Sequence, residues 1–481
     1  MRVAKLGSIA LLLFAAGCAD MRGLSPQARL DDANRLAAGK TLGATRISPA
    51  AWPAEDWWKR YGDPQLDRLI EEALRGSPTL RVAAARQRRA LAYVSVSKAA
   101  LLPRVDGSGS VIRQRFPEHG LYPPPIAGGW DTQNQLQATL DYEIDFWDKN
   151  RAAYESALGQ AKAAEVDTYA ARLALSVNVA QAYVRMQRAY RQLDVMQATL
   201  RQREQIYALT RDRVAAGIDS RLDLKQAEGA IPATREQIVQ QQEAIDLARN
   251  QLAALIGAGP DRGLEIPRPD ARAPEAPELP SAVPADLIGR RPDVVAQRWR
   301  VEAAGRDIDV AKAQFYPNVS LTAFLGLQSI GLSQFLRAGS AIAGAGPALS
   351  LPIFDGGRLR GNLAAADADY DTAVELYNQT LVEALRDVVD QLASLRSVGE
   401  QRRQQRIAVA TAQEAYDLAL LRYREGIGNY LQVLTAQWQL LAQQSLEVDL
   451  DATELSLSIN LTRALGGGFA GGPKSVAAVA R

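Results

Sequence analysis

The chain has 481 residues, of which 47% are hydrophobic and 23% are charged, a composition typical of a folded protein rather than a disordered one. Its 56 basic residues nearly balance its 54 acidic ones, and no basic tract with interleaved aromatic residues is present, so no nucleic-acid partner is expected. One cysteine and one histidine exclude an internal disulfide framework and argue against a metal site built from those two residue types.

The N-terminus has the features of a secretory signal peptide, because a basic start precedes an apolar run over residues 6–16 that is too short to span a bilayer. The run leads into Ala15-Ala16-Gly17-Cys18, which resembles the bacterial lipobox. We therefore expect residues 1–17 to be removed and Cys18 to be lipidated; the alternative is an incidental cysteine near an ordinary cleavage site. Because Ala19 rather than aspartate follows, the resemblance implies the outer membrane, where acyl chains hold a protein at the lipid surface.

Residues 18–60 are expected to form an extended N-terminal arm, because most of them show no clear hydrophobic period. The pair Trp57-Trp58 near its end is interpreted as a packing staple, with a carbohydrate-binding platform as the alternative. The following Asp63-Pro64 predicts a helix start with proline in the first turn.

The segment over residues 135–146 alternates strictly between apolar and polar residues, which predicts a strand with one apolar and one polar face. Its polar positions include three carboxylates, Asp141, Glu143 and Asp145. Three carboxylates on one face suit a water-filled lumen better than a protein core. We expect these three side chains to face a lumen.

A very long helix is expected to follow, over residues 151–216, because this stretch contains no proline and is rich in strong helix formers. At 1.5 Å per residue it would be roughly 100 Å long. Taken alone, such a rod is also compatible with a coiled-coil scaffold.

The chain contains an internal duplication: one unit occupies residues 61–259 and a second, similar unit occupies residues 285–465. Each unit has a proline-bounded helix (residues 79–102 and 293–316), two strands, a very long helix and a returning helix. A repeat of this kind, offset here by roughly 210 residues, dictates the fold. Proline-rich residues 260–284 are expected to connect the two units over the surface, and Gly/Ala-rich residues 466–481 to form a disordered tail.

Each unit supplies two strands, so one chain supplies four, and four strands cannot close a membrane barrel whose edges must be paired. Eight strands from two chains would give an interior filled by side chains, whereas twelve strands from three chains leave room for water. The strand number therefore predicts a homotrimer.

These features together resemble the TolC-type outer-membrane efflux channels, in the NodT-like lipoprotein branch. The residues that carry the resemblance are Trp57-Trp58, Asp63-Pro64, the duplicated proline-bounded helices, the segment over residues 353–358 and the Gly-Ile pairs at the ends of the long helices. The resemblance implies a mainly α fold with a membrane β-barrel: a trimeric twelve-stranded barrel plus a periplasmic α-helical barrel. It also implies a passive conduit that exports drugs or other small toxic compounds without a cofactor, docked to a periplasmic adaptor and an inner-membrane pump.

By the same resemblance, the tunnel closes at the helix tips, residues 217–223 and 426–431. Leu431 matches the apolar gate position of the family, while Gln432 and Thr435 replace the aspartates that commonly form acidic rings there. The other expected gate or tip residues are Asp223, Tyr423 and Arg424, and the expected adaptor contacts are Arg213, Gly217, Arg422 and Gly426. The alternative interpretation is that these are ordinary solvated tip residues.

Two other functions are compatible with parts of the sequence. A lipid-anchored periplasmic helical scaffold without a pore would account for the long helices but not for the acidic alternating strand. A secreted enzyme is disfavoured, because the sequence contains no GxSxG, HExxH or GxxxxGK[ST] pattern. We expect no catalytic residues and no enzyme activity.

Overall fold

The computed structural model describes residues 21–32, 35–36, 48–49, 52–273, 278–279 and 289–470. Cys18, the expected signal peptide and residues 471–481 of the expected tail lie outside the described residues. The chain divides into two compact units. The strand unit comprises Met1–Leu30, Arg86–Ala164 and Gln297–Tyr377, and the helix unit comprises Asp31–Ala85, Glu165–Ala296 and Asn378–Arg481.

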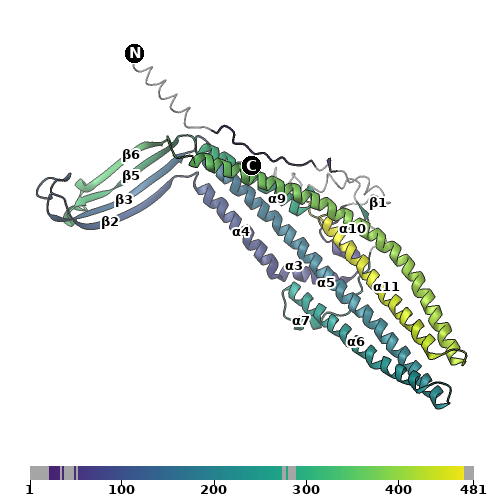
Figure 1. The fold of residues 1–481 in the computed structure, drawn as a ribbon. Helices are drawn as coiled ribbons and strands as arrows, with labels where there is room; N and C mark the ends of the chain where they lie inside the picture. Colours follow the sequence, from purple (N-terminus) through teal and green to yellow (C-terminus); the bar gives the residue numbers. More distant parts are fainter. Residues whose placement is uncertain are drawn as a thin grey trace. The chain divides into compact units, whose positions relative to one another are not determined.

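The two halves of the sequence form matching helices (Figure 1). The proline-bounded helices are α4 (Pro78–Ala99) and α9 (Pro292–Ala313), with 22 residues each. The long helices α5 (Lys149–Ala215) and α10 (Arg358–Arg424) each have 67 residues. They are followed by the returning helices α6 (Arg221–Ile256) and α11 (Tyr430–Ala464). The mainly helical fold predicted from the sequence is therefore confirmed.

Four strands form one antiparallel sheet in the strand unit, in the order β2-β3-β5-β6. Their bounds are Arg104–Arg115 for β2, Trp130–Ile144 for β3, Asn318–Ile330 for β5 and Ala341–Ser350 for β6. Strand β3 begins earlier than expected from the sequence and ends at Ile144, so Asp145 lies outside it. The placement of Asp145 on the strand was therefore wrong.

The sheet has two chemically different faces, because directly paired residues of neighbouring strands point to the same side. Asp141 of β3 is paired with Arg104 of β2 and Thr322 of β5, whereas Tyr142 is paired with Leu321. The polar face carries two apolar residues, Ile112 and Phe324, among Arg104, Asp106, Ser108, Ser110, Gln135, Gln137, Thr139, Asp141, Glu143, Ser320, Thr322 and Gln328. The apolar face carries Val105, Leu136, Ala138, Leu140, Tyr142, Ile144, Val319, Leu321, Leu325, Leu327 and Leu349.

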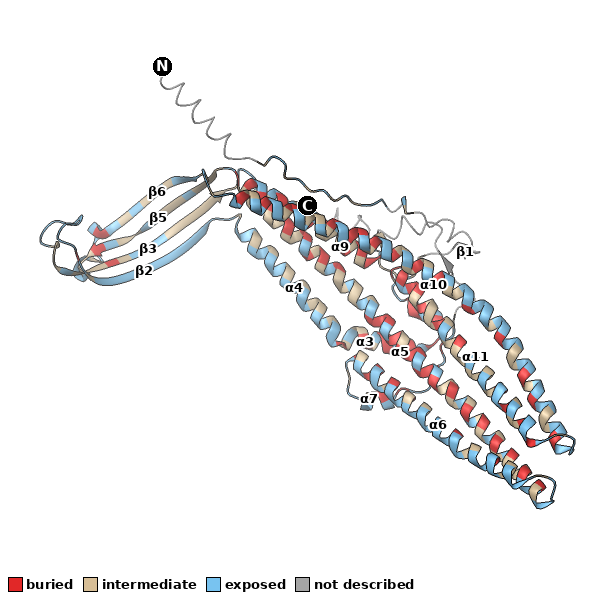
Figure 2. Ribbon diagram, viewed as in Figure 1, coloured by how far each residue is buried: buried red, intermediate tan, exposed pale blue. Residues whose placement is uncertain are grey.

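A core in the helix unit surrounds helix α3 (Pro64–Gly76), which begins as the sequence predicted, with Asp63 as its N-cap and Pro64 in its first turn. The short 3-10 helix η2 (Trp57–Tyr61) packs on α5 and α6, and Trp57 and Trp58 are buried there. Their burial supports the packing interpretation of this pair rather than a carbohydrate platform. Figure 2 shows many buried residues along α5 and few on the four strands.

The remaining described elements are short. They are β1 (Ser48–Pro49) paired in parallel with β4 (Glu278–Leu279), α7 (Asp261–Leu264), and the 3-10 helices η3 (Leu332–Gln334) and η4 (Ala338–Ser340). Residues 466–470, the start of the expected tail, are described, and the Phe469 ring contacts Tyr169 with centroids 5.3 Å apart. Within the described residues, no helix is both long enough and apolar enough to cross a membrane.

Candidate functional site

The two helix tips have the same local structure. Gly217 and Gly426 have positive φ angles of 74° and 78°, which glycine adopts without strain. Each is followed by an isoleucine whose N–H donates back to the carbonyl of an arginine in the last helical turn, at 2.9 Å for Ile218 and 3.0 Å for Ile427. This arrangement is the Schellman motif, which satisfies carbonyl groups at a helix end. The predicted role of the two glycines in reversing the chain is consistent with this geometry.

The returning helices start with side-chain caps. Ser220 and Asp223 form a capping box at the start of α6, in which Asp223 accepts from the Ser220 backbone N–H at 3.0 Å and from its hydroxyl at 2.6 Å. Asn429 caps α11 by accepting from the N–H of Gln432 at 3.0 Å. Asp223 was expected to supply a carboxylate to the gate; in the structure its carboxylate is engaged in this local cap.

A group of side chains that we call the tip latch connects the two tips inside the helix unit. The hydroxyl of Tyr423 donates to Asp219 at 2.5 Å and lies 2.8 Å from the hydroxyl of Thr210. Arg213 donates from Nε and Nη2 to the two oxygens of Asp219, at 2.9 and 3.2 Å. Arg213 also donates to the Tyr423 carbonyl at 2.8 Å, and its guanidinium lies 4.5 Å from the Tyr423 ring centroid.

The tip latch is largely shielded from solvent, unlike an ordinary surface ion pair. Tyr423 is fully buried, and the Arg213 and Asp219 side chains are 9% and 10% exposed. Burial alone would raise the pKa of Asp219, but hydrogen bonds from Arg213 and Tyr423 outweigh it and hold that pKa below 3.8. Burial, followed by the hydrogen bond to Asp219, raises the pKa of Tyr423 to about 12, so this phenol stays a donor at neutral pH.

Two members of the tip latch, Asp219 and Thr210, were not expected from the sequence. The available signal was a carboxylate placed two residues after Gly217, within hydrogen-bonding reach of the preceding helix end. Arg213 was expected to contact a partner protein, but its guanidinium is buried within the chain. The expectation of a surface role for Arg213 is therefore corrected to an internal one.

The other expected tip residues are at the surface. Leu431 is 61% exposed, and Leu222, which occupies the same position after the first tip, is 66% exposed but was not singled out from the sequence. The hydroxyl of Thr435 donates to the Leu431 carbonyl at 2.9 Å, so it is satisfied within the helix. The other tip residues expected from the sequence are also exposed: Gln432, Arg422, Arg424, Gly217 and Gly426.

The strand carboxylates have three different environments. Asp141 accepts from the Thr322 hydroxyl at 3.2 Å on the polar face, next to a chain of hydrogen-bonded amide and hydroxyl groups. Glu143 forms an ion pair with Lys149 at 2.5 Å. Asp145 instead accepts from the backbone N–H groups of Asn150 at 3.1 Å and Arg151 at 2.8 Å, so it caps the start of α5. Only the first two carboxylates belong to the polar face of the sheet.

The N-terminal arm lies along α10 in the strand unit. Asp371 accepts from the backbone N–H groups of Gln27 and Ala28, both at 2.9 Å, and Arg360 donates to the Arg22 carbonyl at 3.2 Å. From residue 22 to residue 27 the extended arm advances about 16 Å, and from residue 360 to residue 371 helix α10 advances by the same length. The arm therefore runs alongside α10 between these two contacts. Met21 and Leu24 add apolar contacts to a cluster of α9 and α10 residues, Ile308, Ala311, Phe315, Leu359 and Leu363.

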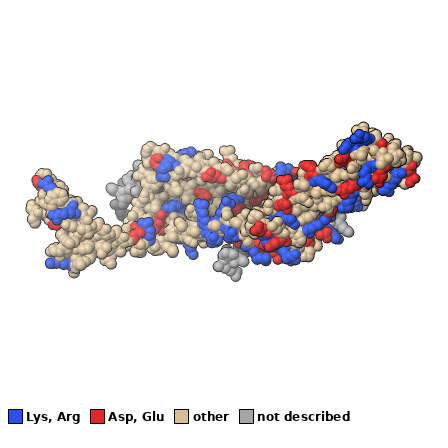
Figure 3. Space-filling model, turned by 90° about the horizontal axis from the view of Figure 1, so that it is seen from below, with Lys and Arg blue, Asp and Glu red and all other residues tan. Residues whose placement is uncertain are grey.

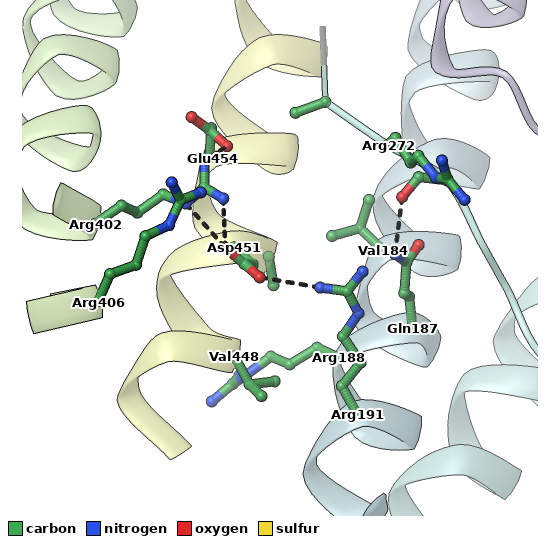
Figure 4. Close-up of a pocket in the computed structure, with 13 residues that line it drawn as sticks. Val184, Gln187, Arg188, Arg191, Arg272, Arg402, Arg406, Val448, Asp451 and Glu454 are labelled. Carbon is green, nitrogen blue, oxygen red and sulfur yellow. Dashed lines mark hydrogen bonds and ion pairs between the residues drawn. The ribbon is translucent and has the colours of Figure 1, made fainter. Parts of the chain in front are cut away.

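A polar cavity of about 370 Å³ lies in the helix unit among α5, α10, α11 and residues 271–273 (Figure 4). Asp451 of α11 accepts from Arg191 of α5 at 3.0 Å and from Arg402 of α10 at 2.8 Å. Arg402 also pairs with Glu454. These partly exposed ion pairs connect three helices, and the lining of the cavity also includes Arg188, Arg272 and Arg406. Figure 3 shows both signs interspersed over the helices. In the described part of the chain, no group of three or more metal-ligating side chains is arranged to hold an ion.

Comparisons with known proteins identify similar chains. The family model described as "Outer membrane efflux protein" matches residues 69–258 and 283–467. The fusaric acid resistance protein FusA of Burkholderia cepacia is 45% identical over 366 residues, which cover 76% of this chain and 69% of FusA. The multidrug resistance outer membrane protein MdtP of Escherichia coli K12 is 34% identical over 435 residues, 89% of each chain. The crystal structure of the outer membrane protein VceC from Vibrio cholerae superposes with a TM-score of 0.82 at 37% identity, covering 87% of this chain and all of VceC.

Proposed function

Because the chain belongs to the outer membrane efflux protein family and is an efflux channel protein of the bacterial outer membrane, we propose that three copies form a passive conduit closed at rest by the helix tips. The proposal includes an adaptor in the periplasm and a pump in the inner membrane, which supplies the energy. It assigns no bond chemistry, cofactor or nucleic-acid partner to this chain. The two-faced four-stranded sheet is the observation that carries it.

The sheet supports a pore shared among chains. Its strands have 10 to 15 residues, and a strand of about 9–11 residues crosses a bilayer. Its outer strands β2 and β6 each pair on one side only within the described chain, and unpaired edges are not tolerated in lipid. Pairing β6 of one copy with β2 of the next closes three sheets into twelve strands, with the polar face toward water and the apolar face toward lipid.

Helix α4 supports association of copies independently of the sheet. Helix α4 has 22 described residues, and none of them is buried. The equivalent helix α9 buries Val294, Val301 and Ile308. Val82, Tyr93 and Val96 lie on one face of α4 and are 50%, 55% and 67% exposed. An apolar face of this kind is covered when a neighbouring copy packs against it.

The tip latch supports a closed resting state, because it joins the α5–α6 tip to the α10–α11 tip through buried, charge-assisted hydrogen bonds. Opening would require these contacts to break. The exposed residues Gly217, Arg422 and Gly426, together with Arg424, are then available to an adaptor, while Leu431 narrows the passage with Gln432, Thr435 and Asp223 beside it.

The N-terminal arm supports a lipid anchor at Cys18. Met21 and Leu24 contact Leu359 and Leu363 near the start of α10, the helix that follows strand β6. Acyl chains on Cys18 would then reach the inner leaflet of the outer membrane next to the barrel. The names of MdtP, a multidrug resistance protein, and FusA, a fusaric acid resistance protein, favour drugs or other small toxic compounds as cargo.

Two experiments test this function against a pore-free periplasmic scaffold. Affinity purification of the native protein from membranes should co-purify one adaptor and one pump. A Cys18→Ala variant should remain membrane-embedded and trimeric on unheated gels. A scaffold held by lipid alone would instead be released as a soluble monomer by that substitution.

A further inference from the structure

The start of helix α11 is unusual in this chain because it carries no charge. Residues 430–446 contain no Lys, Arg, Asp or Glu, whereas the start of α6, the equivalent helix of the other repeat, contains Arg221, Asp223, Lys225 and Glu228. The two repeats therefore present different surfaces over the same length of helix. An exposed helix surface normally carries charged residues, and an uncharged apolar one marks a site of contact with another molecule.

The uncharged residues form an exposed stripe, which we call the α11 stripe: Leu431, Thr435, Trp438, Ala442 and Leu446. Their spacings of three and four residues put them on one face of the helix. Leu431 is 61% exposed, Trp438 66% and Leu446 46%. An exposed tryptophan between two exposed leucines is an apolar face that the described chain does not cover.

The described part of the chain leaves the α11 stripe uncovered, because α11 packs against its neighbours through other positions. Tyr430, Val433 and Leu440 are buried in a cluster with Ile206 of α5 and Tyr416 of α10. Gln437 is 2% exposed and accepts a hydrogen bond from Arg203, itself buried. The helix is thus held by α5 and α10 on one side while the stripe faces away from them.

We propose that the α11 stripes of three copies meet around the trimer axis, and that Trp438 forms a second apolar layer of the closed end behind Leu431. This proposal rests on the trimeric conduit proposed above and deepens it. The two layers are seven residues apart on the helix, or about 10 Å. Two successive apolar constrictions exclude water and ions by dewetting, without the acidic rings that Gln432 and Thr435 replace.

Other copies of this chain fit the α11 stripe better than an adaptor does. A protein docking at the tips would meet the charged residues around Arg422 and Arg424, whereas the stripe extends away from the tip for four helical turns without charge. Of the two equivalent positions in the repeats, only the one on α11 is a tryptophan. The offset that relates Gly217 to Gly426 relates Gly229 to Trp438, and a Cβ on Gly229 would meet no atom within 4 Å.

Cysteine cross-linking tests the position of Trp438. Cys18 is the only native cysteine, so Trp438→Cys introduces a single new thiol in the region. Oxidation or a short bismaleimide should convert this variant to a covalent dimer on denaturing gels. Gly229→Cys, at the equivalent position of the other repeat, and the wild-type protein should stay monomeric on the same gels.

The outcomes separate this proposal from the proposed function. Trimers in which Leu431→Cys cross-links and Trp438→Cys does not would overturn the second layer while leaving the conduit in place. Trimers in which neither cross-links would also overturn it, because the stripe would not face the axis. A protein that is monomeric before cross-linking would instead overturn the conduit itself.

Conductance tests the function of the layer. In planar bilayers, Trp438→Ala should raise the closed-state current, as should Leu431→Ser, and the double variant should exceed either one because the layers act in series. Gln439→Ala, one residue along the helix, serves as the matched control and should behave as wild type. A Trp438→Ala current equal to the wild-type current, with Leu431→Ser raised, would contradict the second layer.

Discussion

Tyr423 and Asp219 lie 204 residues apart in the sequence and at opposite helix tips, yet the phenol hydroxyl of Tyr423 donates to the Asp219 carboxylate at 2.5 Å. Arg213 holds the same carboxylate from the other side. The contact joins the two repeats at the ends of the long helices, where the chain reverses direction in each repeat. Under the proposed function, this contact keeps the two tips together in the closed state.

The first prediction concerns the strength of this joint. Tyr423→Phe keeps the ring and its packing but removes the hydrogen bonds to Asp219 and Thr210. Loss of a buried hydrogen bond to a charged group costs about 1–2 kcal/mol, so the open state should be favoured roughly 5- to 30-fold. Single-channel recording measures this open probability. Arg211→Gln, on an exposed position near the end of α5, is the control, and equal open probabilities in the two variants would remove Tyr423 from the latch.

The second prediction concerns pH. The pKa of Asp219 is lowered in the folded protein, so its contribution is present above about pH 4 and is lost as the pH falls through the folded value, below 3.8. Tyr423 has its pKa raised to about 12, so its contribution is present below about pH 10 and is lost as the pH rises toward 12. The latch should therefore hold at pH 5–8.

Acid titration of the closed-state current checks this sign. The current should rise only below about pH 4 in the wild-type protein. In Asp219→Asn the latch is already weakened, so the current should be higher at pH 7 and should lack that acid step. An acid step of the same size in Asp219→Asn would show that another group is responsible.

The third prediction concerns the N-terminal arm. Asp371→Ala removes the acceptor of the Gln27 and Ala28 N–H groups, so the arm should detach and become sensitive to trypsin at Arg22 and Arg29. Mass spectrometry of the digest measures the cleavage rate, which should rise about tenfold if the contact is worth about 1.4 kcal/mol. Asp369→Ala, on an exposed position of the same helix, should cleave at the wild-type rate.

The fourth prediction concerns the exposed face of α4. Val96→Glu would bury a carboxylate where a neighbouring copy packs, so the trimer should dissociate at lower detergent concentration or temperature than the wild-type protein. Unheated gels and native mass spectrometry report the change. Val239→Glu, on an exposed position of α6, tests whether any added charge has this effect. Equal trimer stability in wild type and Val96→Glu would place α4 outside the interface.

The long elements were predictable because their signals are local. The alternation over residues 136–144 and the absence of proline over residues 151–215 each identify one element without reference to the rest of the chain. The duplication then fixed the order of elements and the position of both tips. Asp145 was misplaced because a strand's alternation does not mark its end, and a carboxylate that continues the pattern can equally cap the next helix.

The tip latch was not predictable in the same way, because its members come together only through packing of the two repeats. Arg213 near a helix end looks like a surface residue, and nothing local to Tyr423 indicates which carboxylate its hydroxyl reaches. Asp219 gave the weaker signal of a carboxylate inside a tight turn. The burial of Arg213, with 9% of its side chain exposed, follows from contacts over 200 residues away in sequence.

Whether three copies form a conduit closed by the tip latch can be measured as ion current through planar bilayers that contain the purified trimer. The wild-type protein should give rare current steps, and the protein that combines Asp219→Asn and Tyr423→Phe should give frequent steps of uniform size. Inserted trimers that stay electrically silent in both forms would contradict the conduit.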